Sequence, residues 1–205
     1  MPRKDSRKAS SRGYADRKVE TKEPFDRFLI VCEGRETEPK YFKSFPVAGD
    51  VKDMSKILGL GVNPSKLVEK TKELKAQGDY DQVWCVFDRD DWPKQDFNNA
   101  IANAEREGFK VAYSNEAFEL WYVLHFEFLN TGLPRNDYIN KLNTFLNKKY
   151  KKNSLTIYEE LESRQAIAIK NAKKIMKQYD PPNPESDNPS TTVHYLVEEL
   201  NKFIR

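Results

Sequence analysis

The sequence predicts an α/β fold: a mostly parallel sheet flanked by helices, with a helical C-terminal half. Up to residue 113, apolar runs typical of strands alternate with longer segments of helical periodicity. Such alternation is typical of a parallel sheet with right-handed crossovers. Beyond residue 113 the pattern is helical. We therefore expect a sheet core over about 25–115 and a helical part over about 116–205.

The strands are predicted from apolar runs that suit a sheet covered on both faces. The first run is Phe28 to Cys32, and the run at 82–87 has the same character. A short strand within 51–60 and a last strand at 109–113 complete the predicted sheet.

The helix boundaries are predicted from capping residues. Thr37 is expected to be an N-cap, with Pro39 in the first turn. Asn63-Pro64 opens the second helix, and Gly108 closes the third. The expected helices are about 37–45, 64–78, 94–107, 117–126, 134–150, 158–179 and 191–204, with a proline-rich loop at 180–189.

Acidic residues follow two of the predicted strands. Glu33 comes after the first strand, and Asp88 and Asp90 come after the strand at 82–87. If these strands are parallel neighbours, their carboxyl ends share one sheet edge, where open α/β sheets bind ligands. Asp88 and Asp90 would face the same way if the extended conformation persisted. Clustered carboxylates favour a hard cation such as Mg²⁺ or Mn²⁺, although the acids could also simply begin polar turns.

The motifs resemble a known family. A Glu-Gly after the first strand and an Asp-x-Asp after a later one resemble the Toprim catalytic domain of topoisomerases, primases and several nucleases. Four segments together, from about residue 28 to the C-terminus, resemble the RloB family of bacterial proteins: Leu29-Ile-Val-Cys-Glu-Gly-Arg-Glu-Thr-Glu-Pro-Lys-Tyr-Phe42, Phe87-Asp-Arg-Asp-Asp91, Ser114-Asn-Glu-Ala-Phe-Glu-Leu-Trp-Tyr-Val-Leu-His-Phe126 and Asn188-Pro-Ser-Thr-Thr-Val-His194. The chain departs from that pattern at Glu116-Ala117, where relatives have a proline, which concerns only the local turn.

The resemblance implies a Toprim/Rossmann-like fold and a nuclease that uses one or two Mg²⁺ or Mn²⁺ ions. Asp88 and Asp90 would bind metal, and Glu33 would bind a second ion or act as general acid or base. The family is linked to restriction loci and abortive-infection defence, where AbiL-type relatives act with a partner ATPase. The substrate, which could be tRNA, other RNA or DNA, and the oligomeric state stay open.

Further candidates follow the last strand. Ser114 and Asn115 should open on the acidic edge, and Glu119 lies early in the next helix. His125 is six residues further and faces elsewhere on a regular helix, so it is a candidate substrate contact or a core histidine. Leu120, Trp121, Val123 and Leu124 are expected in the core.

Other candidates lie beside the acids or near the C-terminus. Arg35 and Arg89 could hold a substrate phosphate or balance the carboxylates. Ser190 or Thr191 could cap the final helix, and the resemblance raises the alternative that both contact substrate together with His194. In the first helix, an electrostatic role at the helix N-terminus is sufficient to explain Glu38.

Composition adds limits. Residues 1–24 contain eight basic and four acidic residues, so the remaining chain carries −1 of the overall +3. We read residues 1–24 as a disordered basic arm. Cys32 and Cys85 lie in apolar runs and are expected to be buried hydrophobes rather than zinc ligands. Neither a membrane span nor an apolar secretory segment is apparent, so we expect a cytoplasmic protein.

Two lysine-rich stretches, 147–152 and 170–174, could bind nucleic acid with Tyr150 and Tyr179 stacking on bases, although such runs are usually solvated. Two alternative functions stay open. One is primase-like nucleotidyl transfer on the same acidic site, and the other is a non-catalytic module that docks a partner.

Overall fold

The computed structural model describes residues 26–47, 56–90 and 92–204. The predicted basic arm, the first half of the predicted 51–60 strand and Asp91 lie outside these ranges. The sheet contains β1 (Phe28–Cys32), β2 (Lys56–Gly59), β3 (Gln82–Asp88) and β4 (Lys110–Ser114) in the order β2-β1-β3-β4. All three strand pairs are parallel, which confirms the predicted fold class.

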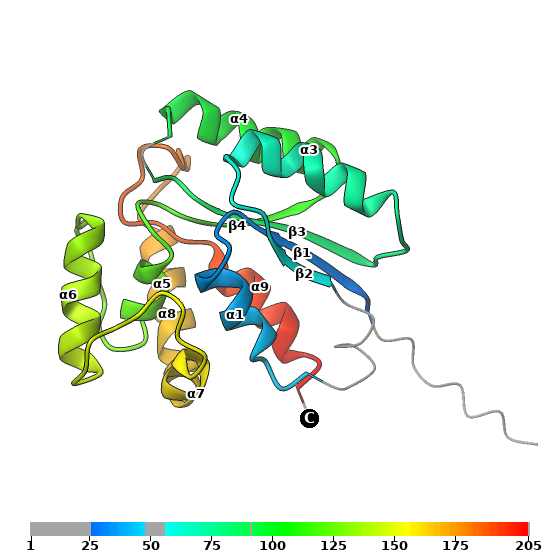
Figure 1. Ribbon diagram of the computed structural model, residues 1–205. Coiled ribbons are helices and arrows are strands. Elements are labelled where there is room, and N and C mark those ends of the chain that lie inside the picture. The colour runs from blue at the N-terminus through cyan, green and yellow to red at the C-terminus, as the bar shows by residue number, and fades with distance from the viewer. Residues whose placement is uncertain (1–25, 48–55, 91, 205) are drawn as a thin grey trace, which may run out of the picture.

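Helices cover both faces of the sheet (Figure 1). On one face lie α3 (Pro64–Lys75) and α4 (Lys94–Arg106), and on the other lie α1 (Thr37–Lys43) and α9 (Val193–Asn201). β1 supplies both cores, because Leu29 and Val31 pack in the cluster beneath α3 and α4 while Phe28 and Ile30 pack on the opposite side. The continuous apolar run in β1 is therefore explained by burial on both faces.

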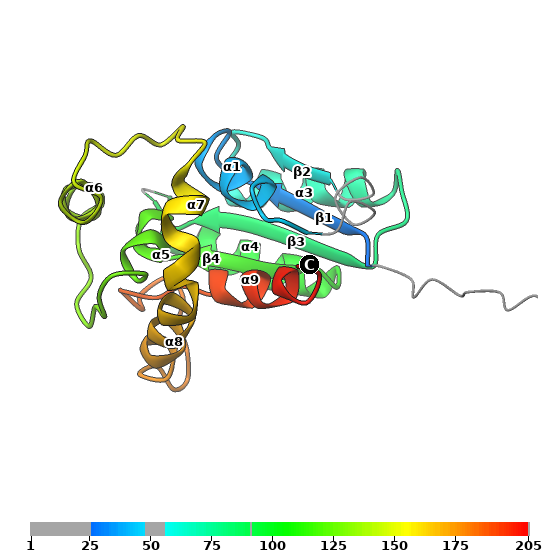
Figure 2. The same ribbon diagram turned by 90° about the horizontal axis from the view of Figure 1, so that it is seen from below.

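The helical half gathers at the carboxyl ends of the strands and below the sheet (Figure 2). It consists of α5 (Glu119–Val123), α6 (Arg135–Phe145), α7 (Ile157–Leu161), the 3₁₀ turn η1 (Glu162–Arg164) and α8 (Gln165–Met176), followed by α9. Among the described residues, no helix has the combined length and apolar character that a bilayer crossing requires.

Several predicted helix boundaries were wrong. The single helix expected at 158–179 is divided by the 3₁₀ turn, and the helix expected at 134–150 ends at Phe145, shortly before Asn147 adopts a left-handed φ of 50°. Thr37 is the first helical residue rather than the N-cap, a position held by Glu36. The predicted helix at 117–126 is limited to Glu119–Val123.

The final helix begins at Val193, two residues later than expected, because the preceding segment pairs with the sheet edge. Thr191 forms an antiparallel bridge with Ser114, and Thr192 donates its backbone N–H to the carbonyl of Tyr113 at 2.9 Å. The Thr191 hydroxyl also donates to the Tyr113 carbonyl at 3.0 Å. Residues near 191 therefore complete the β4 edge before they start the helix.

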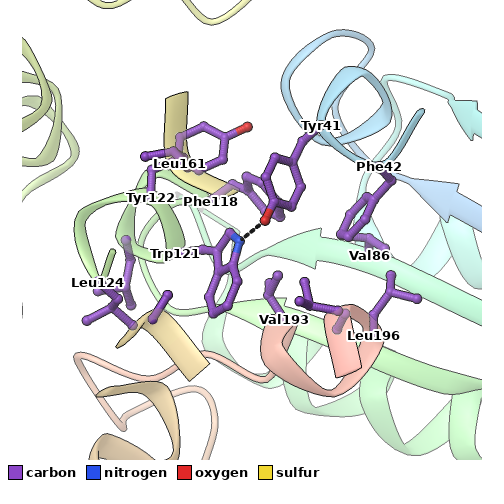
Figure 3. Packing of buried hydrophobic residues seen from close by; sticks show 14 of the residues in the cluster. Tyr41, Phe42, Val86, Phe118, Trp121, Tyr122, Leu124, Leu161, Val193 and Leu196 are labelled. Carbon is purple, nitrogen blue, oxygen red and sulfur yellow. Dashed lines mark hydrogen bonds between the residues drawn. The ribbon is translucent and has the colours of Figure 1, made fainter. Parts of the chain in front are cut away.

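An aromatic contact joins the two halves of the chain (Figure 3). Trp121 in α5 donates its indole N–H to the hydroxyl of Tyr41 in α1 at 2.9 Å, and both side chains are buried. The expected core residues Leu120, Val123 and Leu124 are also fully buried. Both cysteines are buried and free, as expected.

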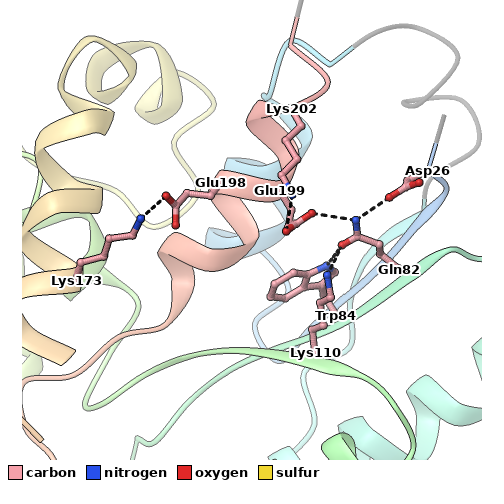
Figure 4. Close-up of polar contacts among 8 residues, drawn as sticks. All are labelled: Asp26, Gln82, Trp84, Lys110, Lys173, Glu198, Glu199 and Lys202. Atoms are coloured by element: carbon pink, nitrogen blue, oxygen red, sulfur yellow. Dashed lines mark hydrogen bonds and ion pairs between the residues drawn. The ribbon is translucent and has the colours of Figure 1, made fainter. Parts of the chain in front are cut away.

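Polar contacts fix α9 against the amino ends of the strands (Figure 4). Gln82 donates from Nε2 to Glu199 at 3.1 Å, while its Oε1 accepts from Trp84 Nε1 at 3.1 Å and from Lys110 Nζ at 3.0 Å. Lys173 of α8 contacts Glu198 at 2.5 Å. Two elements of the helical half are thereby held at defined positions relative to the sheet.

His125 should make the fold sensitive to acid. It is fully buried, its Nδ1 is 2.9 Å from the Trp121 carbonyl, and burial lowers its pKa to about 4. Below pH 6.5 this histidine is protonated in the unfolded chain, whereas in the folded chain it stays neutral down to about pH 4. This histidine alone should therefore remove up to about 3 kcal/mol of unfolding free energy between these pH values.

We predict that the Tm of His125→Phe falls less than that of wild type between pH 7 and pH 5, measured by thermal denaturation. Asn171→Leu is a matched control, because Asn171 Nδ2 donates to the nearby Leu124 carbonyl at 2.9 Å but does not titrate. An unchanged slope in His125→Phe would contradict the assignment.

Candidate active site

Glu33 and Asp88 lie together at the carboxyl edge of the sheet. The parallel pairing of β1 with β3 continues one residue beyond β1, where the Glu33 N–H donates to the Val86 carbonyl at 2.8 Å. The Asp88 N–H then donates to Glu33 Oε2 at 3.1 Å, and Trp92 Nε1 donates to Glu33 Oε1 at 2.7 Å. The expected proximity of the two acids therefore follows from the sheet register.

These acids line a cavity of about 260 Å³ between the sheet edge and the helical half. Six carboxyl groups and three basic groups contribute to its wall, so negative charge is in excess. The acidic residues are Glu33, Glu36, Glu38, Asp88, Asp90 and Glu119, and the basic residues are Arg35, Arg135 and Lys152.

Asp88 has an unsatisfied oxygen in this cavity. Its Oδ2 accepts the Phe118 backbone N–H at 2.9 Å, whereas its Oδ1 is buried and has no hydrogen-bond partner among the described residues. Burial, followed by the charges of Glu38, Glu33 and Glu119, raises the pKa of Asp88 well above its usual value. A buried carboxylate oxygen that lacks a partner and faces like charges is suited to a cation.

Glu33 is similarly shielded from solvent but better satisfied. Burial raises its pKa to about 7, although the N–H groups of Trp92 and Asp88 favour the charged form. The side chain is held in one orientation by these two donors. It can therefore exchange a proton near neutral pH from a defined position.

Glu38 has a larger part in the cavity than its expected role at the helix N-terminus. It is only 4% exposed and accepts the Gly34 N–H at 3.2 Å, and burial is the main cause of its raised pKa. A Cβ atom at Gly34 would overlap the carboxyl group of Glu38. The Glu-Gly motif thus leaves space for a second acid.

Glu119 reaches the cavity from α5, as expected from its position after the last strand. It is 2% exposed, accepts from the Tyr150 hydroxyl at 3.2 Å, and lies 3.9 Å from Lys152 Nζ. Tyr150 and Lys152 precede α7, so their approach to this acid depends on the packing of the helical half and was missed from the sequence.

The expected geometry of Asp90 was wrong. Its φ of 43° lies in the left-handed region, so the strand conformation does not persist beyond Asp88. Asp90 still lines the cavity, but its Oδ1 lies 2.8 Å from Nη2 of Arg135 in α6. Arg135 was also missed, because this contact joins residues 45 positions apart along the chain.

The cavity contains oxygen donors of the kind that a hard divalent cation prefers. Carboxylate oxygens are the ligands that Mg²⁺ and Mn²⁺ prefer, and Asp88 Oδ1 is buried with no partner. Within the described residues, however, no three His, Cys, Asp or Glu side chains are grouped closely enough to hold one ion. Asp90 is engaged by Arg135 and Glu33 by Trp92, so binding would require these side chains to rearrange.

Several predicted substrate contacts lie away from this cavity. Ser114 and Thr191 bond to each other at 3.0 Å between their hydroxyls, and Ser190 and Asn115 join the same edge pairing through a backbone bond of 2.8 Å. His194 is buried in α9. None of these five residues lines the acidic cavity.

Of the remaining candidates, one lines the acidic cavity and two do not. Arg35 lines the cavity and passes over Gly61, where a Cβ would overlap its Nε. Arg89 and His125 do not line it, and His125 packs edge-on against Trp121 at 4.9 Å between ring centroids. Arg35 therefore remains a candidate phosphate contact in direct reach of the acids.

Comparison with known proteins gives one match, to a family model. The model described as RloB-like protein matches residues 28–200. The chain belongs to the RloB-like family. The matched residues of this RloB-like chain include the sheet, the acidic cavity and most of α9. Neither the comparison with curated proteins nor that with solved structures finds a match.

The turn at Glu116 has a left-handed backbone conformation. Glu116 of the RloB-like chain has a φ of 77°. Its carbonyl accepts from Arg135 Nη2 at 3.3 Å. The turn at Glu116 therefore contributes to holding Arg135 at the cavity.

We predict that Asp88→Asn stabilises the metal-free RloB-like chain at pH 8 by about 1–3 kcal/mol, because it removes a buried charge and retains the acceptor for Phe118. Since the folded-state pKa of Asp88 is raised, wild type loses stability as pH rises, and the advantage of the variant should shrink toward pH 5. Thermal denaturation with chelator measures this difference. Asp79→Asn, on a side chain 91% exposed, should change little.

Proposed function

We propose that this RloB-like protein is a metal-dependent nuclease that hydrolyses phosphodiester bonds in nucleic acid. The observation that carries the proposal is the buried, unpaired Oδ1 of Asp88 beside Glu33, Glu38 and Glu119. Several carboxylates placed close together in a partly buried site destabilise the fold unless cations compensate their charges. Such clusters are common where divalent ions act on phosphates.

Asp88, Glu33 and Asp90 are the side chains that would hold Mg²⁺ or Mn²⁺. When bound, such an ion supplies charge neutralisation at phosphate and acidifies a coordinated water. Glu33, with a pKa of about 7, is alternatively suited to act as general acid or base near neutral pH. Glu119 lines the same cavity and is a further candidate catalytic acid.

The basic residues of the cavity are suited to the substrate. Arg135 faces Asp90 with Nη2, and its buried Nε has no hydrogen-bond partner among the described residues. A guanidinium released from Asp90 can bind two phosphate oxygens in parallel. Arg35 lines the same cavity and can contact a neighbouring phosphate.

The biological setting of the proposal rests on the RloB-like family. We infer an effector of bacterial anti-phage defence of the abortive-infection type, controlled by a partner ATPase and acting in the cytoplasm. In this setting we expect low activity of the isolated chain, because Asp90 is paired with Arg135.

We predict cleavage of at least one member of a panel containing tRNA, single-stranded RNA, single-stranded DNA and plasmid, in the presence of Mg²⁺ or Mn²⁺. Glu33→Gln and Asp88→Asn should each lower the rate about 100-fold or more, the scale of a lost electrostatic group in an active site. Asp79→Asn should retain the wild-type rate, and chelation should abolish it.

The outcomes separate the alternatives. Incorporation of nucleoside triphosphates in place of hydrolysis would support primase-like transfer. A second outcome would instead support a module that docks a partner. In that case no cleavage occurs even when the partner ATPase is added, and Glu33→Gln retains its defence against phage.

Metal binding can be tested without an activity readout. We predict that Mg²⁺ or Mn²⁺ raises the Tm of chelator-treated wild type. The free energy of unfolding should increase by about 2.7 kcal/mol when the ion concentration is one hundred times the Kd. Asp88→Asn should lose this response and Asp79→Asn should keep it. Equal responses in all three proteins would exclude Asp88 as a ligand.

A further inference from the structure

A second hollow adjoins the acidic cavity. It has a volume of about 300 Å³ and is formed by the loop between α6 and α7. Three lysines of this loop line it, together with Tyr150 and Asn153. They are Lys148, Lys149 and Lys151.

The two hollows share a wall. Tyr150 lines the lysine-rich hollow, and its hydroxyl donates to Glu119, which lines the acidic cavity. Lys152 lines the acidic cavity, although both its neighbours in the sequence line the other one. The segment from Lys148 to Lys152 therefore lies between the two hollows and contributes side chains to both.

The loop is anchored by its backbone, and two of its four lysine side chains are unpaired. The Tyr150 N–H donates to Asn143 Oδ1 at 2.6 Å, and Lys40 of α1 contacts the Asn153 carbonyl at 3.4 Å. Lys148 pairs with Glu160 at 2.7 Å, and Lys152 lies 3.9 Å from Glu119. Within the described part of the chain, the exposed side chains of Lys149 and Lys151 make neither an ion pair nor a hydrogen bond. A fixed backbone that presents unpaired cations is suited to bind a polyanion.

The acidic cavity supplies few free cations to such a substrate. Its wall has three basic groups against six carboxyl groups, and Arg135 and Lys152 already contact Asp90 and Glu119. Cations beside the cavity can therefore provide phosphate contacts that the cavity itself lacks. The loop lysines are such cations.

The depth of the cavity indicates which form of nucleic acid fits. Asp88 Oδ1 is buried and Glu119 is 2% exposed. A phosphate within a continuous duplex is held at the surface of a wide rod, whereas an unpaired segment can bend into a recess. Leu155, 72% exposed in the same loop, offers an apolar contact to an unstacked base. The stacking role expected for Tyr150 was wrong, because that ring is buried.

We propose that the loop over residues 147–156 binds the backbone of an unpaired nucleic-acid segment and directs it into the acidic cavity. The substrate class is then single-stranded or looped nucleic acid rather than continuous duplex. This inference rests on the proposed nuclease function.

The test uses the full chain carrying Asp88→Asn, so that bound nucleic acid is not cut, and fluorescence anisotropy with a labelled single strand and its blunt duplex. We expect the single strand to bind at least about tenfold more tightly than the duplex. The added pair Lys149→Ala and Lys151→Ala should weaken single-strand binding about five- to tenfold and reduce the salt slope by about 1.4, as expected for two lost contacts.

The matched control is Lys56→Ala with Lys66→Ala, which removes the same charge from exposed positions on β2 and α3. Equal weakening by both pairs, or no weakening by the loop pair, would overturn the inference, as would equal affinity for duplex. The loop variant is also tested with Asp88 intact. If it cleaves the substrate with the KM of wild type, the inference is rejected while the nuclease proposal stands. Selective single-strand binding without any cleavage would reject the nuclease proposal alone.

Discussion

The parallel pairing of β1 with β3 is the constraint on which the candidate site depends. Cys32 lies opposite Val86, so the next residue of the first strand, Glu33, reaches the Asp88 backbone N–H. A shift of this register by one residue would turn the side chains of one strand to the opposite face and separate the two acids. Phe28 and Ile30 pack in one core and Leu29 and Val31 in the other, so such a shift would exchange the side chains of the two cores and disturb their packing.

The helical half converts this acidic edge into an enclosed site. Glu119, Arg135 and Lys152 all approach from residues beyond the last strand. Their positions depend on the buried contact between Trp121 and Tyr41 and on the pairing near Thr191. Arg135 contacts Asp90, so an anion that binds Arg135 would also release the Asp90 carboxylate. Binding of an anion at Arg135 and of a cation at Asp90 would therefore be thermodynamically linked.

The parts predictable from sequence are those that depend on local pattern. Apolar runs identified the strands, and the acids that follow them identified the edge, since parallel order brings carboxyl ends together. The resemblance in motifs identified the family. Arg135, Trp92 and the approach of Lys152 to Glu119 could not be found in this way, because they arise from contacts between distant segments.

Some errors have the same origin at a smaller scale. Periodicity gave no sign of the 3₁₀ turn at Glu162–Arg164 or of the left-handed conformation of Asp90, which depend on the neighbouring helices and on Arg135. The Ser-Thr segment near 190 was typical of a helix cap, and Thr191 Oγ1 does accept the Val193 N–H at 3.3 Å. The same segment also bonds to the sheet edge through its hydroxyls and backbone groups, which the sequence did not indicate.

The pairing of Thr191 with Ser114 also affects how the chain reaches its native state. Residues that complete the β4 edge lie 77 positions beyond it, so this edge exposes unpaired backbone groups until the residues near 191 have been synthesised. Contacts of such large sequence separation form slowly, because the closure of a long loop must precede them. Nascent chains that stall before residue 190 would present an open strand, and they would depend on chaperones to avoid pairing with one another.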